Sequence, residues 1–310
     1  MRSFRSYLVN ALLRLLAKRR FDPSRDLIAY REHLQRVDSR LYRLPRGLHR
    51  ERIVADAIDC EWIGESGIET QRVLLYLHGC GFFLRTPQVH GRLAGRIAAT
   101  LGCRALIPDY RLAPEYPFPC APEDCLRVYR WLLEQGTEPA EIVIAGDSAG
   151  GNLTLATLLM ARDAGLPLPA CGICLSPGID LTLGGFTLVS NERRDPMFRL
   201  QTLLIMKHAY LAGADPSDPL ASPVYASFRD FPPLLFQVGD TELLLDHATR
   251  AYARARAAAL PTQLSVWRGM PHVFQAFASL PEAAQAVAEI AAFVERVAGW
   301  GLPVLSPRRR

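Results

Sequence analysis

A serine set between two glycines is the residue of this chain best suited to do chemistry. The run Gly146-Asp-Ser-Ala-Gly150 follows a strand-like segment, 141–145, and leads into a helical pattern. Between a strand and a helix, G-x-S-x-G forms a sharp nucleophile elbow, in which side chains two positions before and after the serine would collide with neighbouring structure. The competing phosphate-loop pattern, G-x-x-x-x-G-K-[ST], is absent from the sequence. Ser148 is therefore the predicted nucleophile.

A serine hydroxyl needs a general base, and around such an elbow the base follows the nucleophile along the chain. Three histidines lie downstream, His208, His247 and His272. The first two fall in helix-like segments, whereas His272 follows the strand-like segment 263–267. A loop at a strand end can carry a side chain over the sheet. We therefore expect His272 to be the base and the other two to be surface or packing residues.

The acid that orients the base should follow the preceding strand, between the serine and the histidine. That strand-like segment is 234–238, and Asp240, Glu242 and Asp246 come after it. Spacing alone leaves all three carboxylates open.

A second glycine-rich loop, His78-Gly-Cys-Gly81, follows the strand-like segment 73–77. It fits the H-G-G-G type of loop, which donates backbone N–H groups to the oxyanion that develops in acyl transfer. Ala149, the residue after the serine, would donate another N–H. An ordinary glycine turn after a strand would look similar. Because this loop occurs together with the serine elbow, we favour an oxyanion hole.

Short β-rich runs alternate with helix-length patterns from residue 73 onward, which predicts a mostly parallel sheet with helices on both faces. Alternating segments over 52–59 indicate antiparallel edge strands. The stretch 182–220 has no strand-like run, so we expect an excursion over the sheet. Residues 1–45 form amphipathic helices, and we expect their apolar face to pack on the body. That face carries Leu8, Leu12, Leu15 and Leu16.

The composition indicates a globular protein, with 310 residues of which 49% are hydrophobic and 22% charged. Because a nucleic-acid binder needs a basic stripe on its folded body, and none is apparent, we expect no nucleic-acid partner. A weak attraction to anionic surfaces remains open, but no apolar run is long enough for stable membrane insertion. Much of the net charge of +5 lies at the two ends of the chain, at Arg2, Arg5, Arg14, Lys18, Arg19, Arg20 and Arg308 to Arg310.

The seven cysteines are odd in number and scattered along the chain. Cys171 and Cys174 form a C-x-x-C, but they lie in a strand-like run without a second ligand pair at zinc spacing. We therefore expect core thiols in a protein of the reducing cytoplasm, and no metal.

With these motifs in view, residues 70 to 280 resemble the hormone-sensitive-lipase-like branch of the α/β-hydrolases, the bacterial family IV esterases. The resemblance implies an α/β-hydrolase fold, in which a mostly parallel central sheet is flanked by helices and covered by a helical cap. The cap would comprise residues 1–45 and about 182–220, and the catalytic domain residues 46–310. The motifs that carry the resemblance are His78-Gly-Cys-Gly81, Asp109-Tyr-Arg-Leu-Ala-Pro-Glu115, Pro117-Phe-Pro119, Gly146-Asp-Ser-Ala-Gly-Gly-Asn152, Leu175-Ser-Pro177, Asp180, Ser222-Pro-Val-Tyr225 and Gly269-Met270.

Two departures from the family pattern bear on the site. Cys80 replaces the middle glycine of the oxyanion loop, and its N–H can still donate if the backbone tolerates a Cβ. The family commonly has Asp-Pro-Leu after the penultimate strand, whereas this chain has Gly239-Asp-Thr-Glu-Leu243. Matching the later aspartate to Asp246 places the acid on Glu242, with Asp240 as the alternative.

The resemblance implies a serine carboxylesterase that hydrolyses short-chain acyl esters through an acyl-enzyme, with no metal or organic cofactor. The expected catalytic residues are Ser148, Glu242 and His272. The expected oxyanion donors are the N–H groups of Gly79, Cys80 and Ala149. Phe82 and Phe83, directly after the loop, would either wall the substrate pocket or belong to the core.

Other functions fit the same residues less well. An amidase or an arylformamide-type hydrolase would use the same machinery. A non-catalytic ligand-binding protein is disfavoured because the chain has Ser148, His272 and an acid. The expected partner is a small ester, and some families of this kind form homodimers through a C-terminal strand or helix.

Overall fold

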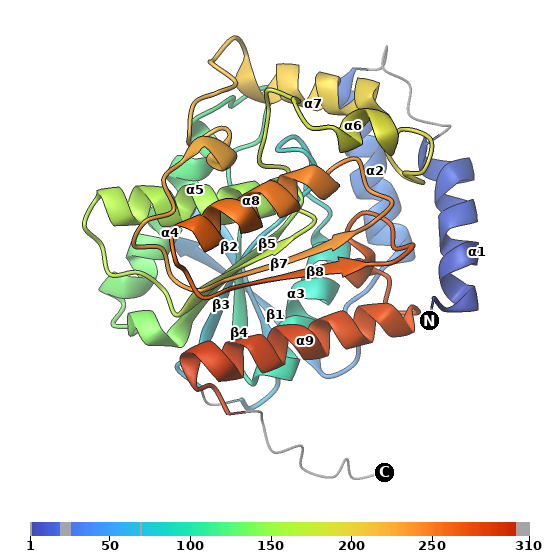
Figure 1. Ribbon diagram of the computed structural model, residues 1–310. Helices are drawn as coiled ribbons and strands as arrows, with labels where there is room; N and C mark the ends of the chain where they lie inside the picture. The colour runs from blue at the N-terminus through green and yellow to red at the C-terminus, as the bar shows by residue number, and fades with distance from the viewer. Residues whose placement is uncertain (1, 19–25, 69, 302–310) are drawn as a thin grey trace.

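One eight-stranded sheet forms the centre of the protein (Figure 1). The structure is a computed structural model that describes residues 2–18, 26–68 and 70–301. The strand order is β1-β2-β4-β3-β5-β6-β7-β8, parallel from β4 to β8, with β1 and β2 antiparallel at one edge. The mostly parallel sheet and the antiparallel edge strands expected from the sequence are thus confirmed. The strands are β1 Leu48–Ala55, β2 Ile58–Glu65, β3 Val73–Leu77, β4 Arg104–Pro108, β5 Ile142–Asp147, β6 Cys171–Leu175, β7 Leu234–Gly239 and β8 Thr262–Trp267.

Helices cover both faces of this sheet, as Figure 1 shows. Alternate residues of β3 enter the two cores that result, because successive side chains of a strand point to opposite faces. Leu74 and Tyr76 pack with α3 and α9, whereas Leu75 and Leu77 pack with α4, α5 and α8. The helices are α1 Phe4–Leu13, α2 Leu27–Leu41, α3 Pro87–Leu101, α4 Cys120–Glu134, α5 Ala149–Asp163, α6 Thr187–Ser190, α7 Leu200–Leu211, α8 Leu245–Ala257 and α9 Pro281–Ala298.

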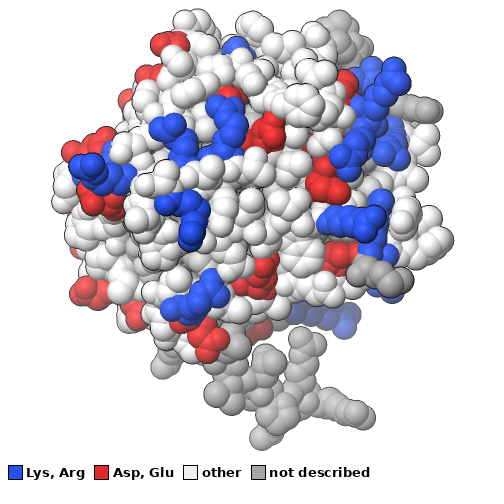
Figure 2. Space-filling view, in the orientation of Figure 1, with Lys and Arg blue, Asp and Glu red and all other residues white. Residues whose placement is uncertain are grey.

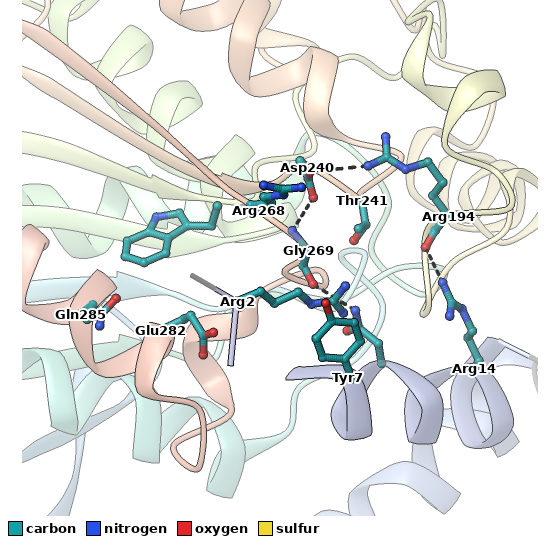
Figure 3. A pocket seen from close by; sticks show the side chains of 12 residues that line it. Arg2, Tyr7, Arg14, Arg194, Asp240, Thr241, Arg268, Gly269, Glu282 and Gln285 are labelled. Atoms are coloured by element: carbon teal, nitrogen blue, oxygen red, sulfur yellow. Dashed lines mark hydrogen bonds and ion pairs between the residues drawn. The ribbon is translucent and has the colours of Figure 1, made fainter. Parts of the chain in front are cut away.

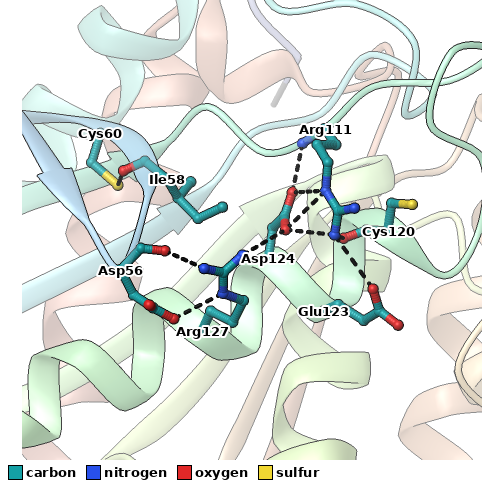
Figure 4. A network of polar contacts seen from close by, with 8 residues as sticks. All are labelled: Asp56, Ile58, Cys60, Arg111, Cys120, Glu123, Asp124 and Arg127. Atoms are coloured by element: carbon teal, nitrogen blue, oxygen red, sulfur yellow. Dashed lines mark hydrogen bonds and ion pairs between the residues drawn. The ribbon is translucent and has the colours of Figure 1, made fainter.

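The loop after β4 is fixed to α4 by charged side chains (Figure 4). The guanidinium of Arg111 donates to both carboxylate oxygens of Asp124, at 2.8 to 3.1 Å. The backbone N–H of Arg111 donates to the same carboxylate at 2.9 Å. One turn further along α4, Arg127 reaches Asp56 in the β1–β2 turn at 2.8 Å. These contacts hold the loop and the turn of the edge hairpin against α4.

The N-terminal helix is oriented opposite to expectation. Its apolar face is exposed, because the residues of α1 that are buried on the body are Ser6 and Asn10. Asn10 Nδ2 donates to the carbonyl of Gly269 at 3.0 Å, so the helix is held by polar contacts. The expectation that the leucines pack on the body is therefore wrong. They are 46% to 56% exposed, at Leu8, Leu12, Leu15 and Leu16.

Two further expectations concern the ends and the excursion of the chain. Among the basic residues noted above, Arg19, Arg20 and Arg308 to Arg310 lie outside the described residues. The stretch 182–220 contains α6, α7 and no strand. No helix in the described part of the chain is long and apolar enough to cross a membrane.

The cysteines are all free, and most belong to the core. Cys171 and Cys174 are fully buried in β6, and burial raises the pKa of both thiols. The expectation of core thiols is confirmed for these two and for Cys60, Cys103 and Cys125, whereas Cys80 and Cys120 are only half-buried.

Candidate active site

Ser148 lies at a tight turn between β5 and α5, with φ at +54° and ψ at −115°. A Cβ added at Gly146 would lie 2.2 Å from the carbonyl oxygen of Gly150. A Cβ at Gly150 would lie 1.8 Å from the carbonyl oxygen of Leu77. Both distances are far inside van der Waals contact with rigid backbone, so only glycine fits at either position. The sharp strand–turn–helix geometry expected from the motif is therefore present.

The structure brings Glu242, and not Asp240, to the histidine. His272 Nδ1 lies 2.8 Å from Glu242 Oε2, in a pair that is buried on both sides. Asp240 instead accepts the backbone N–H of Gly269 at 2.6 Å and lies 3.5 Å from Arg194. Asp246, the third carboxylate, accepts the N–H of Thr187 at 2.8 Å.

The buried carboxylate of Glu242 has a second set of hydrogen bonds besides the histidine. Ser176 Oγ donates to Glu242 Oε1 at 2.8 Å, and the N–H of Gly239 donates to the same oxygen. Ser176 Oγ in turn accepts the N–H of Val273, next to His272, at 3.1 Å. A buried carboxylate is stable only when such donors replace the lost water. Ser176 therefore links the acid to the loop that carries the histidine.

The pKa of His272 is raised above its ordinary value. Burial lowers it, but the hydrogen bond and the negative charge of Glu242 outweigh burial, and the charges of Asp195 and Asp147 act in the same direction. Nε2 of His272 has no hydrogen-bond partner in the described part of the chain. The ring thus has one nitrogen fixed by the acid and the other available for a proton.

A cavity of about 170 Å³ brings the serine and the histidine together, since both Ser148 and His272 line it. Cys80 lies in the same wall. The ring of Phe198 meets the imidazole of His272 edge-on, with 4.8 Å between the ring centres.

A smaller cavity of about 50 Å³ also reaches Ser148, and its other walls are mainly apolar. Phe82 lines it and stacks on Tyr210, with ring centres 3.7 Å apart. Phe83 is buried in the core and lines neither of the two cavities at Ser148.

The N–H groups of the glycine-rich loop are not equivalent. Gly79 donates its N–H to Asp147 Oδ1 at 3.2 Å, so this group is engaged within the protein. No acceptor in the described residues takes the N–H of Cys80, Gly81 or Ala149. The φ angles of Cys80 and Gly81 are +74° and +65°, so this backbone bends in a way that L side chains rarely adopt. Gly81, which was not among the expected donors, lines the smaller cavity at Ser148, whereas Gly79 does not.

Residues of the excursion hold the loop that carries Glu242, and sequence reasoning missed them. Asn191 Nδ2 donates to the carbonyls of Asp240 and Glu242, at 3.1 and 2.8 Å. Asp195 Oδ2 accepts the N–H of Leu243 at 2.9 Å. No motif in the sequence marks Asn191 or Asp195, because their partners are backbone groups distant along the chain.

Neither of the other downstream histidines contacts the acid, although His247 lines the smaller cavity at Ser148. His247 is buried in α8, its Nδ1 accepts the N–H of Ile179 at 3.1 Å, and burial lowers its pKa to about 4. His208 is exposed on α7 and lies 2.7 Å from the carbonyl of Leu204. Over the described ranges, no group of three or more His, Cys, Asp or Glu is arranged to hold a metal ion.

Comparisons with known proteins agree with this architecture. A family model described as the alpha/beta hydrolase fold matches residues 74–276. An acetyl-hydrolase of Streptomyces hygroscopicus is 40% identical over 243 residues, which are 78% of this chain and 81% of that protein. An esterase of Acinetobacter venetianus is 37% identical over 224 residues, 72% of this chain and 74% of that protein. A solved esterase of the bacterial hormone-sensitive lipase family matches with a TM-score of 0.90 and 40% identity, covering 96% of this chain and 100% of that one.

The sheet, the helices on its two faces and the family model together define an α/β-hydrolase. The chain belongs to the bacterial hormone-sensitive lipase family, and it is a carboxylic ester hydrolase. The resemblance expected from the motifs is confirmed.

We predict that Glu242→Gln lowers kcat/KM by about 10³-fold or more, because an amide neither stabilises an imidazolium nor fixes the Nδ1 proton. The acid limb of the pH profile should also change. His272 must be neutral to accept a proton, and Glu242 raises its pKa. Removing that charge should therefore move the limb to lower pH, as measured with a soluble chromogenic ester.

Asp240→Asn is the matched control, because this carboxylate lies in the same loop but contacts Gly269 and Arg194. We expect a loss of no more than about tenfold and an unmoved acid limb. Near-normal kcat in Glu242→Gln, or a larger loss in Asp240→Asn, would show that the acid is assigned to the wrong residue.

We predict that thiol reagents inhibit slowly at neutral pH and faster at alkaline pH. Burial, with the nearby charge of Asp147, raises the pKa of the Cys80 thiol to about 12, so little reactive thiolate is present near pH 7. Because Cys80 lines the cavity at Ser148, its modification should block activity. Cys80→Gly should resist the reagent, whereas Cys120→Ser should remain sensitive. Equal inhibition of wild type and Cys80→Gly contradicts this assignment.

Proposed function

We propose that this protein hydrolyses short-chain acyl esters in two steps, through an acyl-enzyme on Ser148. The observation that carries the proposal is the buried Glu242–His272 pair, in which Nε2 has no partner among the described residues and His272 lines the same cavity as the elbow serine. A nucleophile, a base and an orienting acid are the elements that this chemistry requires.

In the first step, His272 Nε2 takes the hydroxyl proton while Ser148 Oγ attacks the ester carbonyl carbon. Glu242 accepts the hydrogen bond from Nδ1–H and stabilises the imidazolium that forms. The imidazolium then gives its proton to the leaving alcohol oxygen, and the bond between that oxygen and the acyl carbon breaks. In the second step, water loses a proton to Nε2 and attacks the acyl carbon, and Ser148 Oγ leaves with that proton.

We propose Cys80, Gly81 and Ala149 as the donors that hold the oxyanion, in place of the expected set with Gly79. The N–H of Gly79 already serves the Asp147 carboxylate, and an oxyanion would have to compete with that negative charge. N–H groups without an acceptor inside the protein can bind the developing oxyanion without first breaking another hydrogen bond.

The walls of the smaller cavity support a short acyl group. Leu203 and Met206 of α7 face Phe82 across about 50 Å³, which leaves little room for a long chain. The name acetyl-hydrolase, carried by the relative from Streptomyces hygroscopicus, is consistent with this preference. We assign residues 1–45 and about 182–220 to the cap, of which the second segment lines this cavity, and 46–310 to the catalytic domain.

Each step in this scheme is a proton transfer or an acyl transfer by side chains of the chain itself. The proposal accordingly involves no metal and no organic cofactor, and its partner is a small ester. We expect the protein to act in the reducing cytoplasm, where free thiols persist.

We predict that Ser148→Ala lowers hydrolysis of p-nitrophenyl butyrate by about 10⁴-fold or more, because the acyl acceptor is lost. The exposed Ser39 on α2 offers a matched control, and Ser39→Ala should retain the rate of wild type. If wild type is inactive on all short acyl esters, the esterase assignment fails.

We predict that wild type cleaves p-nitrophenyl butyrate faster than the matched butyryl p-nitroanilide. An amine is a poorer leaving group than an alcohol and depends more heavily on protonation by the His272 imidazolium before it can leave. Initial rates on both substrates measure this preference. A higher kcat/KM on the anilide would establish an amidase instead.

A further inference from the structure

The outer face of α1 and of the helical turn Arg14–Lys18 that follows it is an apolar stripe without a partner in the described residues. Phe4, Leu8, Leu12 and Leu15 recur at helical spacing and are 53% to 75% exposed. Tyr7, beside them, is 56% exposed. Single exposed apolar residues are ordinary on a protein surface, but a contiguous apolar patch of this kind marks an interaction site.

The stripe faces outward because the opposite face of the helix is firmly attached to the body. The N–H and hydroxyl of Ser3 donate to the carboxylate of Glu282, at 2.6 and 2.9 Å. Further along, Asn10 Nδ2 binds the carbonyl of Gly269, and Lys18 Nζ donates to the carbonyl of Asp195 at 2.8 Å. Turning the leucines inward would break these contacts, so the outward orientation is the stable one.

Every ionisable side chain in residues 2–18 other than Tyr7 is a cation, at Arg2, Arg5, Arg14 and Lys18. None of these four is paired with a carboxylate within the described residues. On the side of the molecule that carries α1, Figure 2 shows groups of basic side chains with acidic side chains between them and uncharged surface beside them.

A basic groove of about 940 Å³ runs along the inner edge of α1 (Figure 3). Four arginines line it, from both sides, against two carboxylates, Asp240 and Glu282. Two of the arginines belong to the segment 2–18, and the two from the body balance the two carboxylates, so the net positive charge of the groove comes from that segment. The arginines are Arg2, Arg14, Arg194 and Arg268.

The cap continues this surface. Arg14 donates to the carbonyl of Arg194 at 3.2 Å, and Lys18 binds the neighbouring cap residues, so α1 ends beside the segment that follows α6. Phe186 and Val189, at α6, are 77% and 75% exposed. The stripe of α1 and these two residues are the apolar part of what we call the N-terminal face.

We propose that the N-terminal face docks on the surface of an anionic phospholipid bilayer. An amphipathic helix with aromatic and leucine residues on one side and cations around it lies in the plane of the membrane interface and does not span the bilayer. The basic groove would take up lipid phosphate groups. A second copy of the chain fits less well, because the segment 2–18 offers only positive charges to its own counterpart.

Docking in this way would bring the candidate active site to the lipid surface. The segment 2–18 is bound to Gly269, in the loop that carries His272, and to Asp195, in the cap segment next to Phe198. The inference concerns a surface and not the catalytic steps, so it stands or falls independently of the proposed function.

The test is co-sedimentation of the full chain with vesicles. Two compositions are compared, phosphatidylcholine alone and phosphatidylcholine with about 30% phosphatidylglycerol, at low salt. We expect binding to the anionic vesicles at least about tenfold tighter than to the neutral ones, and its loss at about 0.5 M NaCl, where charges are screened. No binding by wild type, or equal binding to both compositions, overturns the proposal.

Paired variants separate the apolar and the charged contributions. Leu8→Ser with Leu12→Ser, and separately Arg5→Gln with Arg14→Gln, should each weaken anionic-vesicle binding at least about tenfold. Val54→Ser with Tyr116→Ser removes two comparably exposed apolar side chains from other elements and should leave binding unchanged. Hydrolysis of a water-soluble ester by each variant reports that the fold is intact.

Measuring the oligomeric state tests the alternative, in which a second copy of the chain covers the apolar stripe. Analytical ultracentrifugation of wild type without vesicles should give a species that Leu8→Ser with Leu12→Ser does not change. A dimer that this variant dissociates would mean that the stripe binds a second copy, and the proposal would be overturned.

Discussion

The arrangement of the site depends on one backbone contact, where the start of α5 lies against the end of β3. At Gly150 there is no room for a single methyl group, since a Cβ would lie 1.8 Å from the carbonyl oxygen of Leu77. This close approach places the serine elbow next to the loop that begins at His78. It also brings Asp147 to Gly79, where an added Cβ would lie 2.2 Å from the carboxylate. The contact that exposes the serine thus also determines which N–H groups remain available.

A second constraint is the buried negative charge of Glu242. An ionised carboxylate without water needs donors on every side, and here they come from β6, β7 and the histidine loop. Ser176 supplies one donor and the N–H of Gly239 another. The excursion 182–220 acts on this residue indirectly, because Asn191 donates to the backbone carbonyl of Glu242 and not to its carboxylate. The excursion therefore also fixes the position of Glu242. Because Glu242 orients His272, the cap segment is coupled to the catalytic base.

Local patterns predicted most of the sheet and the elbow, because close packing restricts residue type at single positions such as Gly146 and Gly150. His272 was predictable because parallel strands bring their carboxyl ends to one edge. Spacing did not identify the acid, because Asp240 and Glu242 are only two residues apart. It is the turn after β7 that points the Glu242 side chain to His272 and the Asp240 side chain to Gly269. The hydrogen bond from the N–H of Gly79 to Asp147 could not be predicted from the sequence either, because it joins the ends of two different strands.

The orientation of α1 shows why an amphipathic pattern does not by itself tell which face meets the body. The carbonyl of Gly269 lies in a buried site, and a buried carbonyl without a donor is costly. Asn10 satisfies it, and the carboxylate of Glu282 takes both donors of Ser3. The body therefore presents polar groups to the helix, and the face with Ser6 and Asn10, next to Val9, is the one that binds. Burying Leu8 and Leu12 in its place would leave those groups unpaired, so the apolar stripe remains outside, next to the cations of the same segment.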